Sequence, residues 1–158
     1  MQTILYTDTD QVRSVFGVDS KDMPDATITG RNPEKELRLD LASWLPTHGT
    51  IYNAGMEAAA TDEEVQLSDA LNLYSTYFCC DLVVGSVQMA APQAVSDGKN
   101  SMNRFTPMDW QRIEDRIKGK LATYKQLLQE LTSASVESAG FAMFSGVGLA
   151  LDPVTEVE

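Results

Sequence analysis

The sequence predicts a mainly α-helical protein, built as a bundle of two long and two shorter helices that ends in an extended C-terminal arm. Apolar residues recur every three or four positions over two long stretches, which is the spacing of a buried helix face. Helix-capping residues precede these stretches, and glycine or proline ends them. A chain of 158 residues suits one domain with a real core. We expect a helical domain over residues 1–132 and a docking arm over residues 133–158.

The first half of the chain predicts two short helices. Residues 7–10, Thr-Asp-Thr-Asp, open a helix that Gly17 is well placed to end. Residues 19–29 form a turn-like connection with room for one helical turn. Asn32 and Pro33 then supply an N-cap and a first-turn proline. The apolar side of this second helix, before Pro46, is Leu37, Leu41, Trp44 and Leu45.

The first long helix begins at a capping box, with Thr61 as N-cap and Glu64 three positions later, and runs to about residue 91. Gly85 falls in its apolar seam and would let a neighbouring element approach closely. Apolar residues on its other faces predict a central helix that is contacted from several directions. Its expected buried side is Leu67, Leu71, Tyr74, Phe78, Leu82 and Met89.

The second long helix begins at Thr106 and Pro107. Its nearly unbroken apolar seam is Trp110, Ile113, Ile117, Leu121, Tyr124, Leu128 and Leu131. We expect a loop of small residues with two glycines at residues 46–60 and a polar loop at residues 92–105. The short β-prone runs at residues 3–6 and 50–52 predict a small strand pair.

Residues 133–158 are apolar and glycine-rich and contain no basic residue. Three glycines and a proline make a separate helix unfavourable, yet the segment is too apolar for an ordinary disordered tail. It needs a surface to lie on, either its own domain or another chain. The anchors that we expect in this arm are Phe141, Met143, Phe144, Val147, Leu149 and Leu151.

The charge pattern indicates contacts between unlike surfaces. The net charge of −11 argues against a protein that grips nucleic acid. Seven of the twelve basic residues lie in residues 99–130, however, and the rest of the chain is acidic. Within this block Arg112, Arg116 and Lys120 form a stripe four residues apart. It could be a solvated helix face, a contact for an acidic surface of a neighbouring copy, or a DNA-binding face.

No catalytic constellation is evident, so we expect a protein that is not an enzyme and needs no cofactor. Cys79 and Cys80 are adjacent, which predicts two buried thiols in a reducing compartment rather than a disulfide. Together with His48, which we expect in a surface loop, they provide too few ligands for a structural zinc site. The glycines at 146 and 148 and the Gly98-Lys99 pair lack the rest of a phosphate-binding loop.

The sequence lacks the patterns of a membrane span and of a signal peptide, which bears on where in the cell the protein is expected. No apolar run approaches the length of a membrane span, and the N-terminal residues lack the basic start of a signal peptide. We therefore expect synthesis and retention in a cytoplasm, or in a particle assembled there.

The N-terminal half resembles the head–tail connector family of tailed bacteriophages, also called adaptor or head-completion proteins. The resemblance lies in residues 12–18 (VRSVFGV), 23–25 (MPD) and 36–46 (ELRLDLASWLP). They are similar to the family's short helix ending in Gly-Val, its acidic turn, and its acidic-leucine helix closing in Leu-Pro. The long helix, the loop ending at residues 103–105 (NRF), the amphipathic helix and the tail follow the family's layout.

The resemblance implies a virion structural protein of the phage neck. Such a subunit forms a homo-oligomeric ring, typically a dodecamer, below the portal protein and joins the DNA-filled head to the tail. It implies an arm that docks on the portal or on neighbouring subunits, a face for tail or nozzle proteins, and a channel through which genomic DNA passes without specific binding. The alternatives are an acidic helical interaction module that binds or regulates a basic protein partner, and, with least support, a small helical enzyme.

Overall fold

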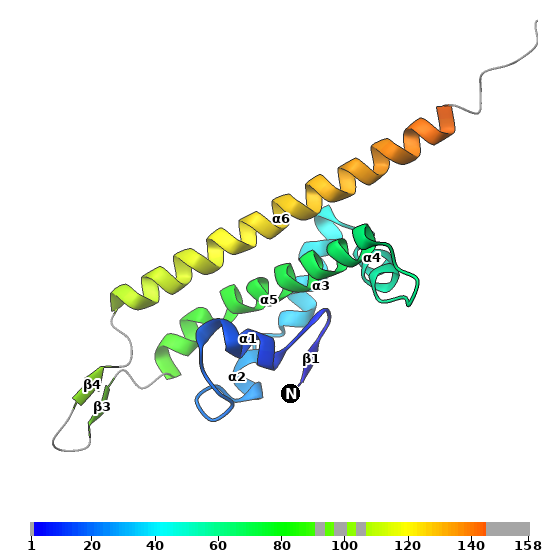
Figure 1. Cartoon of the computed structure of the whole chain (residues 1–158). Coiled ribbons are helices and arrows are strands. Elements are labelled where there is room, and N and C mark those ends of the chain that lie inside the picture. Colours follow the sequence, from blue (N-terminus) through cyan, green and yellow to red (C-terminus); the bar gives the residue numbers. More distant parts are fainter. Residues whose placement is uncertain (1, 91–93, 97–100, 104–106, 145–158) are drawn as a thin grey trace, which may run out of the picture.

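The computed structural model of the chain describes residues 2–90, 94–96, 101–103 and 107–144 (Figure 1). It confirms the predicted mainly helical class, with two long helices packed together and a small hairpin near the N-terminus. In chain order the elements are β1 (Thr3–Ile4), β2 (Thr7–Asp8), α1 (Thr9–Phe16), α2 (Asp25–Thr29), α3 (Pro33–Trp44), α4 (His48–Gly55), α5 (Asp62–Ala90), β3 (Ala94–Ser96), β4 (Ser101–Asn103) and α6 (Pro107–Phe144).

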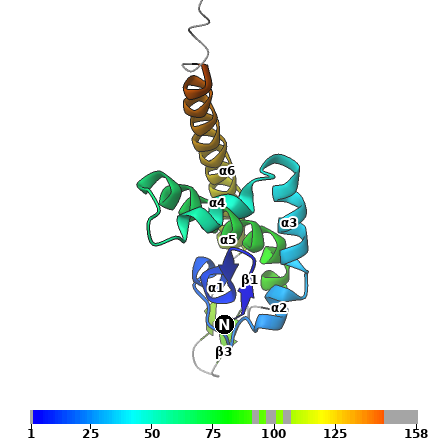
Figure 2. The ribbon, with the colours of Figure 1, turned by 90° about the vertical axis from the view of Figure 1, so that its right-hand side faces the viewer.

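Helix α5 lies at the centre of the molecule. It packs against α6 along one side and against α4, β2, α1, α2 and α3 elsewhere (Figure 1). Helices α5 and α6 run in opposite directions, with the β3–β4 hairpin at the end where they connect. Figure 2, turned by 90°, shows α3 on one side of α5 and α4 near its start. The last turns of α6 extend beyond the rest of the body.

The predicted caps explain where α1 and α5 begin. The Asp8 carboxylate accepts hydrogen bonds from the backbone N–H groups of Asp10 and Gln11, at 2.8 and 2.9 Å. At the start of α5, the Thr61 hydroxyl accepts from the Glu64 N–H at 3.3 Å, and the Glu64 carboxylate accepts from the Thr61 N–H at 2.8 Å. Gly17 ends α1 with a φ of 67°, which a residue with a side chain rarely adopts. These local signals therefore place the helix starts as the sequence predicts.

Two clusters of buried side chains lie along α5. The first surrounds its C-terminal half and brings together the hairpin, α1, α2 and the start of α6. The second surrounds its N-terminal half and includes α3 and the middle of α6. The predicted seam of α6 is confirmed, because Trp110, Ile117 and Leu128 are buried and the other members are partly buried. The clusters explain why α5 is apolar on several faces.

Arg13 is a buried charge that the sequence pattern did not indicate. Its guanidinium donates to the backbone oxygen of Met23 at 2.7 Å and pairs with Asp10 at 2.5 Å and with Asp25. Hydrogen bonds from Thr9 and Arg13 hold the pKa of the Asp25 carboxyl below its usual value. Arg13 therefore ties α1 to the connection before α2, as expected of a buried charge that is fully paired.

The predicted loop at residues 46–60 is partly wrong, because His48–Gly55 form α4. Ile51 and Tyr52 of this helix pack against the second cluster, so tertiary packing overrides the weak helix propensity of a segment with two glycines. The predicted pairing of residues 3–6 with 50–52 is also wrong. Instead, β1 pairs with β2 in a tight hairpin, with Ile4 opposite Thr7.

His48 lies in α4 rather than in a surface loop, half-buried beside the N-terminal hairpin. Its Nδ1 atom and the Tyr6 hydroxyl form a hydrogen bond, and the two rings meet edge to face. Burial, followed by the charge of Arg38, lowers the pKa of His48 below its usual value. A neutral imidazole therefore belongs to the folded state.

Two expectations about the second half of the chain also need correction. The predicted loop at residues 92–105 contains β3 and β4, which pair with Val95 opposite Met102. The arm that we expected to be extended from residue 133 begins later, since α6 continues to Phe144. Residues 133–139 (SASVESA) contain no glycine or proline, and the helix propagates through them at little cost. Residues 145–158 lie outside the described residues.

The close approach between helices occurs at a different glycine from the one predicted. Gly85 is exposed, and a Cβ added there would meet no atom within 4 Å. At Gly55, the last residue of α4, an added Cβ would lie 2.3 Å from the Ser68 Cβ and 2.6 Å from the Glu64 oxygen. Gly55 therefore allows α4 to end directly against α5.

A matched pair of leucines on α3 tests the core. Leu41 is fully buried in the second cluster, whereas Leu39 is 73% exposed. We expect Leu41→Ala to lower the free energy of unfolding by about 2–5 kcal/mol through lost burial and a residual cavity. Leu39→Ala should change it by less than about 0.5 kcal/mol. Urea unfolding followed by circular dichroism measures both, and equal effects would contradict this core.

The His48 environment predicts a pH dependence of stability. Because the folded-state pKa lies below the unfolded value, the unfolded chain binds more protons as the pH falls through the region between the two. Stability from this group is therefore complete above about pH 6.5 and declines as the pH falls toward the lower folded-state pKa. Urea unfolding at pH 7.5 and 5.5 should show a smaller loss for His48→Gln than for the unchanged chain, and an equal loss would refute the assignment.

Candidate interaction surfaces

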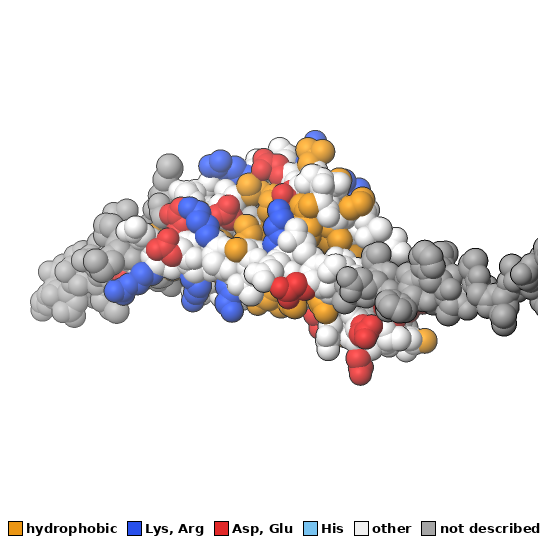
Figure 3. Space-filling view, turned by 90° about the horizontal axis from the view of Figure 1, so that it is seen from above, with side chains coloured by type: hydrophobic (Ala, Val, Ile, Leu, Met, Phe, Trp, Pro, Cys, Tyr) orange, Lys and Arg blue, Asp and Glu red, His pale blue; other side chains and the backbone are white. Residues whose placement is uncertain are grey.

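The predicted basic stripe lies on the exposed face of the first half of α6. Arg112, Arg116 and Lys120 are all exposed, and the Arg112 side chain is 73% accessible. Arg112 lies 3.9 Å from the Asp109 carboxylate, and the Lys120 ammonium lies 5.9 Å from the centre of the Tyr124 ring. Figure 3, which looks onto α6, shows basic side chains concentrated toward the β3–β4 end and hydrophobic ones toward the other half. The stripe is therefore accessible to a partner.

Arg116 has a structural role as well. Its guanidinium donates to the backbone oxygen of Val15 at 2.9 Å, which ties α6 to the end of α1. The neighbouring Lys118 pairs with Glu114 at 2.6 Å, and Lys125 lies over the Trp44 ring at 4.8 Å from its centre. Arg112 and Lys120 are thus the better candidates for a contact with another molecule.

An acidic surface lies at the opposite end of the α5–α6 pair. Glu57, Asp62, Glu63 and Asp69 are exposed around the start of α5, and no basic residue lies between positions 57 and 69. Because α5 and α6 are antiparallel, the start of α5 lies far from the start of α6 (Figure 1). The helix pair therefore presents an acidic cluster at one end and, at the other, a basic stripe that has Asp109, Glu114 and Asp115 beside it.

An apolar groove runs between α5 and α6, and we call it the α5–α6 groove. Leu73 and Leu127 are each 39% exposed in it, which is high for leucines on paired helices. The rings of Tyr77 and Tyr124 stack with their centres 5.6 Å apart next to it. The groove has a volume of about 280 Å³ and is lined by Gln66, Asp69, Ala70, Leu73, Tyr124, Leu127 and Leu131.

The predicted arm residues fall into two groups. Phe141, Met143 and Phe144 belong to the last turns of α6, but their side chains lie outside the described residues. Val147, Leu149 and Leu151 lie outside them entirely. Their predicted contacts stay predictions, and the structure shows where the described part of α6 ends, at Phe144.

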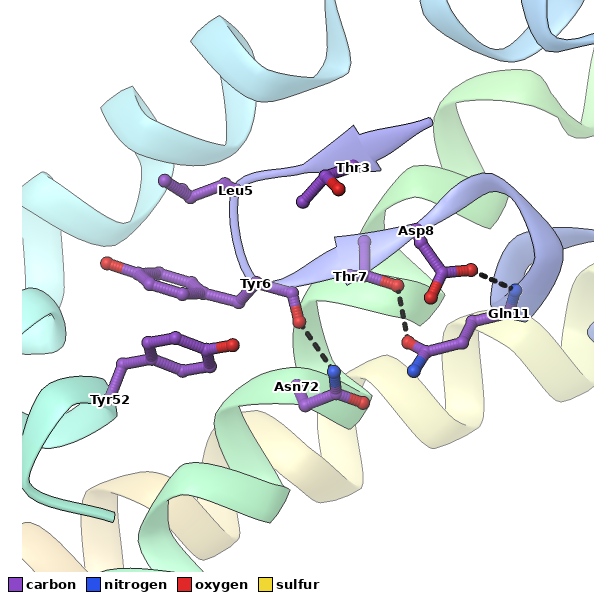
Figure 4. A pocket seen from close by; sticks show the side chains of 8 residues that line it. All are labelled: Thr3, Leu5, Tyr6, Thr7, Asp8, Gln11, Tyr52 and Asn72. Carbon is purple, nitrogen blue, oxygen red and sulfur yellow. Dashed lines mark hydrogen bonds between the residues drawn. The ribbon is translucent and has the colours of Figure 1, made fainter. Parts of the chain in front are cut away.

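A second hollow, of about 170 Å³, lies beside the N-terminal hairpin (Figure 4). Its polar groups form hydrogen bonds within the hollow. The Thr7 hydroxyl donates to the Gln11 side-chain oxygen at 2.8 Å, and the Asn72 amide donates to the Tyr6 backbone oxygen at 2.5 Å. These bonds attach the hairpin to α1 and α5, which indicates a structural role. The lining residues are Thr3, Leu5, Tyr6, Thr7, Asp8, Gln11, Tyr52 and Asn72.

The cysteines are buried and unbridged, as predicted. Burial raises the pKa of the Cys79 thiol to about 12 and also raises that of Cys80, so both are poor nucleophiles at neutral pH. Among the residues that the structure describes, no three His, Cys, Asp or Glu side chains gather closely enough to hold a metal ion. None of the helices in the described part of the chain has an apolar stretch sufficient to cross a bilayer.

Comparison with known proteins identifies no family, relative or fold neighbour for this chain. No protein-family model, curated protein or solved structure matches this chain. The surfaces of the chain and the family resemblance of its sequence are therefore what indicate a function.

Proposed function

We propose that this chain is a structural subunit of the bacteriophage neck, which assembles as a ring below the portal protein and joins the head to the tail. The family resemblance of residues 12–46 suggests this role. The observation that carries it is the placement of opposite charges at the two ends of the α5–α6 pair. A ring requires a heterologous contact between two different surfaces of the same subunit, and these ends provide such surfaces.

The electrostatic complementarity can be stated in terms of residues. Arg112 and Lys120 of one copy would face Asp62 and Glu63 of the next, and all four side chains are exposed. Such rim charges mainly steer association and select the register, while apolar contacts supply most of the affinity. A two-fold dimer that pairs two identical ends would place like charges together and is disfavoured.

The net charge of −11 fits a channel through which DNA moves. An acidic lining repels the phosphate backbone, so the duplex does not adhere by counterion release. In this proposal the basic stripe lies at the contact between subunits, where it is neutralised. Genomic DNA then passes without a specific binding site.

The arm would connect the ring to the portal protein. Helix α6 carries its end beyond the body, so residues 145–158 begin at a distance from the subunit core (Figure 1). An apolar segment that contains glycines can add to a sheet edge or enter a preformed groove and gain backbone hydrogen bonds there. Tail or nozzle proteins would bind the opposite face of the ring.

The alternative is an acidic interaction module that binds a basic protein partner. It is favoured by exposed apolar residues beside the acidic end, since Met56 is 67% and Val65 40% exposed. This module would bind its basic partner as a monomer or dimer and would show no affinity for portal rings. The oligomeric state on the portal therefore separates the two functions.

Charge reversal tests the ring contact. We expect Arg112→Glu combined with Lys120→Glu to prevent ring formation on purified portal rings, and the further changes Asp62→Lys and Glu63→Lys to restore it. Electron microscopy of the mixtures measures ring occupancy. Lys35→Glu, at an exposed position on α3, is a control for added negative charge and should leave rings intact. Equal ring formation by all variants would show that the basic stripe is not the subunit contact.

Truncation tests the portal-binding role of the arm. A chain that ends at Phe144 keeps α6 and should retain the circular dichroism and melting temperature of the full chain, because the two buried clusters are untouched. Its co-sedimentation with portal rings should fall at least tenfold. Undiminished binding would exclude the arm as the docking element, and loss of the fold would be visible in the melting curve.

A further inference from the structure

We propose that the α5–α6 groove is a docking site for an amphipathic α-helix of a partner protein. The helix that fits carries leucine-like residues on one face and a lysine or arginine one turn away from them. This inference goes beyond the proposed ring contact, because it involves none of the four side chains that the ring contact uses.

The α5–α6 pair has two long edges, and α3 covers one of them. On that edge the Trp44 ring of α3 packs edge to face on Tyr74 of α5, with ring centres 5.2 Å apart, and Lys125 of α6 lies over the same Trp44 ring. Leu127 is two residues from Lys125 and therefore lies on a different side of α6. The groove follows this other edge, and all of its lining residues belong to α5 and α6.

Helix α3 shows what a helix needs to lie along this pair. Its buried leucines and the one at its C-cap recur every four residues, at positions 37, 41 and 45, and join the second cluster. A polar contact accompanies them, because the Tyr74 hydroxyl of α5 donates to the Asp40 carboxylate at 2.6 Å. Leucines at helical spacing beside one charged group are therefore the chemistry that we expect of a helix on the open edge.

The groove suits a helix better than an extended segment. Every lining residue is helical, so the backbone groups of both walls already bond within α5 and α6. An extended segment would bury N–H and C=O groups against this lining without partners, which is costly. A helix satisfies these groups internally and presents side chains alone to the groove.

The lining has the spacing that receives such a helix. Each wall is a row of residues at i, i+3 and i+7, which lie on one face of a helix. Seven residues of helix span about 10 Å, or about two turns, and an occupant with anchors at i, i+4 and i+7 covers the same length. Leu73 and Leu127, each 39% exposed, are the side chains that it would cover. The rows are Gln66, Asp69 and Leu73 on α5, and Tyr124, Leu127 and Leu131 on α6.

Asp69 determines the charge of the occupant. It is exposed, and it is the one charged residue among those that line the groove. It lies one turn before Leu73 on α5, about 6 Å along the helix axis. A lysine or arginine one turn from a leucine of the occupant therefore meets Asp69 when that leucine packs on Leu73, whereas a carboxylate there would be repelled. The methylene groups of a basic side chain also cover apolar surface.

A second copy of this chain is a poorer occupant. The outward face of α3 carries Lys35 and Leu39 four residues apart, and Leu39 is 73% exposed. The next residues on that face are Ala42 and Ser43. A single leucine would therefore enter a groove that is about two turns long, and much of its apolar lining would stay uncovered. A partner with a second leucine one turn further on fills it.

Charge exchange between groove and ligand tests the chemistry of the occupant. The probes are two hydrocarbon-stapled helical peptides with leucines at i, i+4 and i+7, one with lysine and one with glutamate a turn from the first leucine. Fluorescence anisotropy on the full chain should show saturable binding of the lysine peptide and at least tenfold weaker binding of the glutamate peptide. In Asp69→Lys this preference should reverse. Absence of saturable binding, or equal binding of the two peptides, would overturn the inference.

Substitutions on the two walls locate the binding site. Leu73→Gln on α5 and Leu127→Gln on α6 keep a helix-forming residue of similar length and add no charge. Each should weaken binding of the lysine peptide at least fivefold through lost apolar contact. Leu39→Gln, at the exposed position of α3, is the matched control and should bind normally. If all three variants bind as the unchanged chain does, the groove is not the site.

Sedimentation velocity distinguishes a partner helix from a second copy. We expect the chain without peptide to show no self-association that depends on the groove. Association that both Leu39→Gln and Leu127→Gln abolish would identify α3 of a second copy as the occupant, and the inference would then be wrong.

The outcomes also separate this inference from the proposed function. The chain with Arg112→Glu and Lys120→Glu should still bind the lysine peptide, and Leu73→Gln should still form rings on portal particles. Loss of rings in Leu73→Gln would place the groove in the subunit contact and overturn the inference. Peptide binding by a chain that never forms rings would refute the neck role and retain the groove as a docking site.

Discussion

The packing of α5 against its neighbours is the constraint on which the rest of the structure depends. This helix contacts α6 on one side and α4, the N-terminal hairpin, α1, α2 and α3 on others, so most of its apolar residues are buried or partly buried. The two buried clusters follow it from end to end and position α6 relative to the N-terminal elements. The basic stripe and the α5–α6 groove are therefore positioned by how α6 lies on α5.

Antiparallel packing has an electrostatic consequence. The acidic residues at the start of α5 complement the helix dipole there, and Asp62 and Glu63 also remain exposed. The basic block belongs to the first half of α6, which the antiparallel arrangement places at the other end. Separation of charge along the sequence thus becomes separation of charge in space. Within one subunit the acidic start of α5 lies too far from the stripe to pair with it, and Arg112 pairs with Asp109 instead.

The features that the sequence predicted well depend on local chemistry. The capping box of Thr61 and Glu64, the glycine stop at Gly17 and the apolar seam of α6 follow from neighbouring residues alone. Helix α4 was missed because tertiary packing of Ile51 and Tyr52 supports it. The close contact at Gly55 depends on the position of Ser68 on another helix. The local sequence does not distinguish this glycine from Gly85, which lies on an exposed face of α5. The groove also depends on tertiary structure, although the apolar Leu73 and Leu127 gave a signal.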